Sequence, residues 1–259
     1  MAPGPSSDRP DSRARGAALE FDFDGARSAL LRASSIEPIG LLHRSSNYTF
    51  LVRLTVDATE HLGIYKPGRG ETPLWDFPAG TLYRREVAAY VLSRALGWPL
   101  VPPTVVREDA PHGPGALQHF VEADLSRHYL GLDRRPRRTW LPVALFDVLA
   151  NNADRKSGHC LFDEAGRPWM IDHGLTFHRE DKLRTVIWDF AGERLPAELR
   201  GDLVRVARQL EGDSLGGELR SLLASAEVRM LRRRLEMALE PGWTFPGPSS
   251  GWSVPWPVV

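Results

Sequence analysis

Two short segments, each with an aspartate beside a predicted strand, constrain this chain more than any other feature. Residues 151–159 read Asn-Asn-Ala-Asp-Arg-Lys-Ser-Gly-His, and residues 170–174 read Met-Ile-Asp-His-Gly. An Asp-Arg pair, a metal-capable side chain five positions later and a second Asp-x-Gly after a short hairpin are typical of catalytic loops in phosphoryl transfer. We therefore expect Asp154 to orient or deprotonate an acceptor hydroxyl and Asp172 to bind the metal that bridges nucleotide phosphates.

A lysine and a glutamate upstream fit the same chemistry. The apolar strand 62–65 ends at Lys66, which is placed to reach nucleotide phosphates and to act in catalysis. Glu86 follows twenty residues later, near the start of a helix predicted over 81–92 from its apolar spacing. Lys66 is one of three lysines in a chain whose positive charge is nearly all arginine, which favours a specific need for a compact ammonium. We expect Glu86 to pair with it.

Two further segments are candidates for nucleotide contacts. The polar turn 43–50 offers Ser45, Ser46 and Asn47 to phosphates, although it lacks the glycines of a protein-kinase loop. Segment 118–122 is predicted to be the hinge whose backbone meets an adenine, so Gln118 and Phe120 are included among the cofactor-binding residues. An ordinary turn remains an equal interpretation of the first segment.

The order of the predicted elements indicates an α+β, bilobal, protein-kinase-like fold. A disordered tail over 1–20 precedes a small β-rich lobe with one helix over 21–117. The hinge 118–122 leads to a larger, mainly helical lobe over 123–240. Helices are predicted in that lobe over the ranges 140–150, 196–210 and 215–238. The Trp/Pro-rich segment 241–259 is interpreted as a strap that packs its indoles against this lobe, with a flexible polyproline-like ligand as the alternative.

Composition excludes several other classes. The 259 residues include 33 basic and 33 acidic ones, and this zero net charge argues against broad nucleic-acid binding. A single cysteine, Cys160, rules out an intramolecular disulfide and is expected to be a small buried hydrophobe. No apolar stretch approaches the length of a membrane span, and residues 1–15 do not resemble a secretory signal, so the default expectation is a cytoplasmic protein.

The motifs together resemble atypical kinases. Segment 152–155 is similar to Asn-Thr-Asp-Arg of the type II phosphatidylinositol 4-kinases, and 171–177 is similar to their Ile-Asp-Asn-Gly-Leu-Ala-Phe. Tyr-Lys-Pro at 65–67 resembles their Phe-Lys-Pro. The chain thus resembles, over about residues 41–210, the superfamily of phosphatidylinositol 3-/4-kinase-related and HipA-like kinases. Trp-Asp-Phe-Pro at 75–78 further resembles a phosphatidylinositol-kinase-like group from actinobacteria.

The resemblance implies an ATP-dependent phosphotransferase that uses Mg²⁺ or Mn²⁺. It assigns catalysis to Asp154, with Arg155 bracing it or the acceptor, and metal binding to Asp172. The second metal position departs from the family, because His159 stands where relatives have asparagine, and imidazole suits manganese or zinc better than magnesium. The implied acceptor is a hydroxyl on a protein, a small molecule or a phosphoinositide, and peripheral contact with a membrane is left open.

Other interpretations remain at this point. The chain could be a nucleotide-binding pseudokinase, or a kinase-fold enzyme that transfers another group such as AMP. A metal-dependent hydrolase using His159, Asp172, His173 and His178 is a third possibility, although these spacings match no zinc signature. An arginine-rich stretch over 127–138 could face an anionic group, but a solvated loop explains it more simply.

Overall fold

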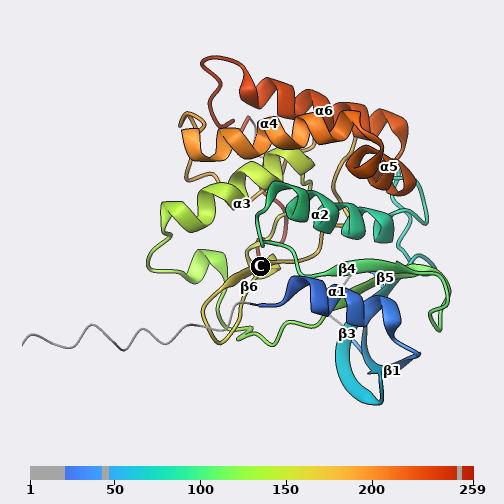
Figure 1. The fold of residues 1–259 in the computed structure, drawn as a ribbon. Helices are drawn as coiled ribbons and strands as arrows, with labels where there is room; N and C mark the ends of the chain where they lie inside the picture. The colour runs from blue at the N-terminus through green and yellow to red at the C-terminus, as the bar shows by residue number, and fades with distance from the viewer. Residues whose placement is uncertain (1–20, 43–46, 250–252) are drawn as a thin grey trace, which may run out of the picture.

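The computed structural model describes residues 21–42, 47–249 and 253–259, which form two lobes of an α+β fold (Figure 1). In Figure 1 the sheet lies at the bottom, α4 and α6 lie at the top, and α3 lies between these levels on the left. The bilobal, kinase-like fold class expected from the sequence is confirmed. The expected disordered tail, Ser45, Ser46 and Trp252 lie outside the described residues.

The small lobe is built on a five-stranded antiparallel sheet with the order β1-β2-β3-β5-β4. Its strands are β1 (Ser35–Leu41), β2 (Phe50–Val56), β3 (Thr59–Pro67), β4 (Thr104–Arg107) and β5 (Gly115–His119). Asp57 and Ala58 join β2 to β3 with φ angles of 48° and 63°, as a tight hairpin turn requires. Alternate residues of β2 are buried, which fits one face of the sheet packing on a core.

A helix that the sequence reasoning missed, α1 (Phe23–Arg32), covers part of this sheet, so the small lobe holds two helices rather than one. Asp22 caps it, because its side chain accepts a hydrogen bond from Gly25 N at 2.8 Å. At the other end Arg107 donates to Leu30 O at 2.8 Å. The strand thus satisfies a helix carbonyl, a long-range contact that no local pattern reveals.

Helix α2 (Leu82–Leu96) belongs to the small lobe by sequence but is fixed to the large lobe by its polar contacts. It ends at Gly97, whose φ of 72° is the left-handed conformation that glycine adopts easily. Arg85, although buried, forms an ion pair of 2.5 Å with Glu227 of the last helix. A second ion pair of 2.7 Å joins Arg94 to Glu218. In Figure 1, α2 accordingly lies between the sheet and the upper helices.

The large lobe holds four helices and a short hairpin among the residues described. They are α3 (Arg137–Ala150), β6 (Cys160–Phe162), β7 (Pro168–Met170), α4 (Ala197–Glu211), α5 (Asp213–Leu222) and α6 (Ser225–Leu239). The single helix expected over 215–238 is wrong, because Leu223 and Ala224 adopt extended conformations and separate α5 from α6. Glu227 stabilises the new helix start by accepting a hydrogen bond from Ala224 N at 2.9 Å. Among the helices described, none is long and apolar enough to cross a bilayer.

The chain after α6 runs back to the middle of the large lobe. Val258 O accepts a hydrogen bond from Ser157 N at 2.7 Å, in the segment that follows Asp154. Trp243 is half-buried and packs on Phe245 with ring centroids 5.1 Å apart. Trp256 is 88% exposed, so the expectation that the strap buries its indoles is wrong at this residue.

Candidate active site

One ammonium group joins the two lobes. Lys66, near the end of β3, forms ion pairs with Glu86 of α2 and, at 3.2 Å, with Asp172 Oδ1 in the loop after β7. The other oxygen of Glu86 accepts a hydrogen bond from His173 N at 3.0 Å. Glu86 therefore positions both the lysine and the backbone beside Asp172. The sequence-predicted residues Lys66, Glu86 and Asp172 are brought together as expected for a phosphate site.

Lys66 and Asp172 keep each other ionised through their opposite charges. Burial alone would lower the pKa of Lys66, but the nearby carboxylates of Asp172 and Glu86 outweigh burial and raise it. The charge of Lys66 in turn holds the pKa of Asp172 below its usual range. Burial raises the pKa of Glu86, which shares the single ammonium with Asp172. The cleft thus presents one cation and an ionised carboxylate side by side.

Asp172 has a left-handed backbone conformation, a type of strain that is often found at functional sites. Its φ of 60° is in the left-handed region, where a non-glycine residue costs about 1 kcal/mol or more. The conformation turns Oδ1 toward Lys66 and leaves Oδ2 3.3 Å from His159 Nε2. The side chain remains 45% exposed. An acceptor oxygen that is open to the cleft and held ionised suits a divalent cation.

His159 is held by two contacts that fix its protonation. Its Nδ1 accepts a hydrogen bond from Lys156 N at 3.3 Å, so in the neutral ring Nε2 carries the proton and donates toward Asp172. Burial lowers the pKa of His159 to about 4. For Nε2 to bind a metal, the ring must change tautomer and give up the bond to Lys156. In the structure His159 orients Asp172.

This burial predicts a pH effect on stability. The folded pKa of His159, about 4, lies below the usual 6.5, so the unfolded chain takes up a proton that the folded chain refuses as pH falls from 6.5. The free energy of unfolding should lose about 1.4 kcal/mol per pH unit around pH 5 from this residue alone. His159→Asn should remove that contribution in urea denaturation at pH 7, 6 and 5. The exposed His61→Asn is the control, and parallel curves for His159→Asn and the unaltered protein would contradict the assignment.

Asp154 lies at the mouth of the same cleft. Its backbone N donates to Asn152 Oδ1 at 3.0 Å, which shapes the loop, and its carboxylate lies 3.3 Å from Lys156 Nζ. Burial raises the pKa of Asp154, and the charge of Lys156 offsets part of the rise. A carboxylate with a raised pKa that lines the same cavity as Lys66 and Asp172 is suited to accept a proton. Asn152 acts as a loop-shaping residue.

The structure places Arg155 in the interior, apart from the cleft. Its guanidinium is fully buried and donates to both oxygens of Asp147, at 3.0–3.1 Å. It also donates to Ile171 O at 3.0 Å and contacts His173 Nε2 at 2.7 Å. The group therefore ties α3 to the loop of Asp172 and supports it from behind. Sequence reasoning missed Asp147, although a lone aspartate in the apolar run 140–150 was a signal.

A cavity of about 120 Å³ joins these residues. It is lined from both lobes by residues that include Asn47, Lys66, Glu86, Asp154 and Asp172. Of the predicted cofactor-binding residues, Gln118 and Phe120 do not line it. The Gln118 side chain is buried and donates to Thr104 Oγ1 at 2.9 Å. Any contact of the hinge with a base would thus use the backbone.

The other expected clusters do not form metal sites. Among residues 21–42, 47–249 and 253–259, no three His, Cys, Asp or Glu side chains are arranged to hold a metal. His173 is buried against Arg155, and His178 Nε2 lies 3.0 Å from Asp76 O. The hydrolase interpretation, which needs these histidines to converge, loses its ligand set. Cys160 is buried and reduced, and burial raises the pKa of its thiol to about 12.

Sequence comparison places the chain in a family. No family model matches it, but it is 38% identical to Protein Rv2133c of Mycobacterium tuberculosis, covering 89% of this chain and 94% of that protein. The chain belongs to the Rv2133c family.

One solved structure shares the fold at low sequence identity. A hydra Fam20 structure with sugar aligns over 87% of this Rv2133c-family chain and 91% of its own, with a TM-score of 0.55 and 18% identity. The Helicobacter pylori proinflammatory kinase CtkA aligns over 79% of the chain with a TM-score of 0.48 and 14% identity. At such low identity the Fam20 match shows the fold alone.

Proposed function

We propose that this protein is an ATP-dependent phosphotransferase of the atypical kinase type. The observation that carries the proposal is the position of Lys66, which contacts Glu86 from α2 and Asp172 from the large lobe at once. A lysine on the third strand paired with a glutamate of the following helix, beside a metal-binding aspartate, is the arrangement that kinases use to hold a triphosphate.

The proposed mechanism uses the residues as the structure positions them. Lys66 neutralises phosphate oxygens, and Asp172 would hold a Mg²⁺ or Mn²⁺ ion, which when bound would neutralise further phosphate charge. The acceptor hydroxyl oxygen forms a bond to the γ-phosphorus while the bond from that phosphorus to its bridging oxygen breaks. The hydroxyl proton passes to Asp154, and ADP leaves. The cavity of about 120 Å³ matches phosphate groups rather than a whole nucleotide, so the base would lie outward, against the hinge 118–122.

The acceptor is proposed as a hydroxyl on a protein, a small molecule or a phosphoinositide. The motif resemblance to phosphatidylinositol 3-/4-kinase-related enzymes supports the lipid. The arginine-rich stretch gives it little support, because Arg135 stacks on Tyr129 and pairs with Asp189. Arg137 pairs with Glu193. Two of the five arginines of this stretch are thus paired within the fold.

A second candidate, transfer of AMP or nucleotide binding without turnover, is favoured by His159. Its Nε2 proton faces Asp172, where relatives present an asparagine, so the second metal position differs in chemistry. ATP labelled on the γ-phosphate or on the α-phosphate separates the cases. If the acceptor takes up label from the γ-phosphate but not from the α-phosphate, the protein transfers phosphate. If the acceptor takes up label from the α-phosphate, the protein transfers AMP. Saturable ATP binding without label transfer and without hydrolysis would support the interpretation as a pseudokinase.

The presence of His159 also leads us to predict which metal ion the protein prefers. Imidazole binds Mn²⁺ better than Mg²⁺, whereas an amide oxygen suits Mg²⁺. We expect wild-type turnover to be higher with Mn²⁺ and His159→Asn to shift the Mn²⁺ to Mg²⁺ activity ratio toward Mg²⁺ by about tenfold, as a ligand change of this kind permits. Initial rates at saturating ATP with each ion measure it. An unchanged ratio would show that His159 orients Asp172 and binds no metal during turnover.

A further inference from the structure

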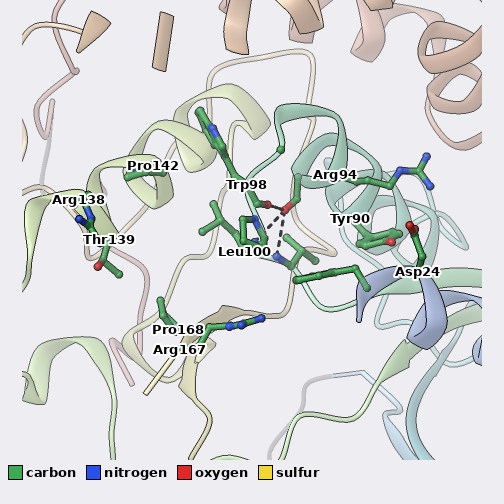
Figure 2. A pocket seen from close by; sticks show the side chains of 15 residues that line it. Asp24, Tyr90, Arg94, Trp98, Leu100, Arg138, Thr139, Pro142, Arg167 and Pro168 are labelled. Atoms are coloured by element: carbon green, nitrogen blue, oxygen red, sulfur yellow. Dashed lines mark hydrogen bonds between the residues drawn. The ribbon is translucent and has the colours of Figure 1, made fainter. Parts of the chain in front are cut away.

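A second, larger cavity lies further along α2, toward the C-terminal end of the helix. It has a volume of about 550 Å³ and shares no lining residue with the cavity around Lys66. Its walls come from α1, the last turns of α2, the connection 97–101, the start of α3 and the turn into β7 (Figure 2). Four separate stretches of chain thus line a space of the size that small organic molecules occupy.

The floor of this cavity is apolar and buried. Tyr90, Trp98 and Leu100 are buried and line it. Ser93 Oγ holds the connection in place by accepting hydrogen bonds from Leu100 N and Val101 N, each at 3.3 Å, drawn as dashed lines in Figure 2. A rigid aromatic and aliphatic floor favours a ligand with an apolar, ring-like body.

One polar group on this floor lacks a hydrogen-bond acceptor. Tyr90 is 2% exposed, yet no residue of the described chain accepts a hydrogen bond from its hydroxyl, which Arg94 approaches only as a donor. Burial raises the pKa of Tyr90, and the nearby charge of Arg94 offsets only part of the rise, so the hydroxyl keeps its proton. A buried donor without an acceptor costs about 1–3 kcal/mol. A ligand oxygen that accepts from this hydroxyl would remove the cost.

The rim is positively charged. Arg94, Arg138 and Arg167 line the cavity against one carboxylate, Asp24, and Figure 2 shows Arg138 on the side opposite Arg94. Arg94 is already paired with Glu218. Within the described residues, Arg138 and Arg167 have no carboxylate partner; Arg167 only stacks on aromatic rings, 5.5 Å from that of Trp169. Two guanidinium groups are therefore available to an anion.

We propose that this cavity binds a small organic anion. Its apolar ring body lies on Tyr90, Trp98 and Leu100, its carboxylate or phosphate group meets Arg138 and Arg167, and an oxygen accepts the hydrogen bond of the Tyr90 hydroxyl. The site is separate from the proposed nucleotide site and stands whether or not the protein transfers phosphate. It also lies on the helix that carries Glu86, four residues before Tyr90.

A pair of probes with the same rings and different charge tests this proposal. Anilinonaphthalene sulfonate carries an anion, and phenylnaphthylamine is its neutral counterpart. The full-length protein should bind the sulfonate at one site by fluorescence titration, about tenfold tighter than the neutral probe. The double variant Arg138→Gln/Arg167→Gln should lose about tenfold in sulfonate affinity and keep its affinity for the neutral probe. Arg134→Gln, an exposed arginine outside the cavity, is the control.

Two further variants locate the probe. Tyr90→Phe should weaken sulfonate binding a few-fold, roughly one lost hydrogen bond, and should raise the melting temperature of the free protein, because the unpaired hydroxyl is removed. Thr139→Trp, which fills the cavity from α3, should abolish binding of both probes. Equal affinity for the two probes, or no effect of the arginine and Thr139 variants, would overturn the proposal. The proposal would also be overturned if the protein had twice its expected molecular mass and bound the probe more weakly as protein concentration rose. A second copy of the chain would then occupy the cavity.

Discussion

Asp154→Asn should reduce phosphate transfer by about two to four orders of magnitude, the range that loss of a general base or acid causes. Asparagine preserves the shape of the side chain but cannot accept the acceptor's proton. Nucleotide affinity should change little, because Lys66 and Asp172, which we propose hold the phosphates, are untouched. Initial rates with γ-labelled ATP and calorimetric titration of ATP measure the two quantities separately.

Asp133→Asn, on the exposed arginine-rich loop, is the matched control and should leave both quantities unchanged. A wild-type rate for Asp154→Asn would refute the assignment of Asp154 as the base. A loss of ATP affinity equal to the loss of rate would instead place Asp154 among the residues that bind the nucleotide or its metal. Asp172→Asn provides that comparison, since it should weaken ATP affinity in the presence of metal far more than in its absence.

The largest effect on stability is expected from Arg155→Met. The substitution leaves the carboxylate of Asp147 fully buried with only two neutral donors, Asn152 Nδ2 at 2.9 Å and Thr185 Oγ1 at 3.2 Å. Breaking a buried pair in this way typically costs about 3–5 kcal/mol. That is a large part of the total stability of an ordinary domain. Urea denaturation monitored by tryptophan fluorescence measures the loss.

Removing both charges provides the control for this prediction. The double variant Asp147→Leu/Arg155→Met should recover much of the lost stability, because no unpaired charge remains in the interior. If Arg155 instead contacted the acceptor, Arg155→Met would leave the urea midpoint nearly unchanged and reduce only the rate. The two readouts thus distinguish a supporting arginine from a catalytic one.

Much of the candidate site was predictable because its residues carry their own local signals. Lys66 ends an apolar strand, Glu86 begins a helix, and Asp154 and Asp172 lie in short polar breaks beside apolar segments. Their order along the chain was therefore enough to predict that they meet across two lobes. Their roles in phosphate transfer stay predictions until the variants above are measured.

The features that were missed depend on contacts between distant segments. Helix α1 gains its stability from packing on the sheet and from Arg107, which lies seventy-seven residues after Leu30. The break between α5 and α6 depends on the conformations of Leu223 and Ala224, neither of which is a helix breaker by type. The interior position of Arg155 follows from its pairing with Asp147. Short sequence patterns contain no information about these contacts between distant segments.

The attachment of α2 to the large lobe has a consequence for control. Many kinases switch off by swinging the equivalent helix outward and separating its glutamate from the lysine. Here such a swing would have to break the buried ion pair of Arg85 with Glu227. It would also have to break the partly exposed ion pair of Arg94 with Glu218. We therefore expect a permanently assembled lysine–glutamate pair, and an enzyme whose output is governed by substrate supply rather than by rearrangement of this helix.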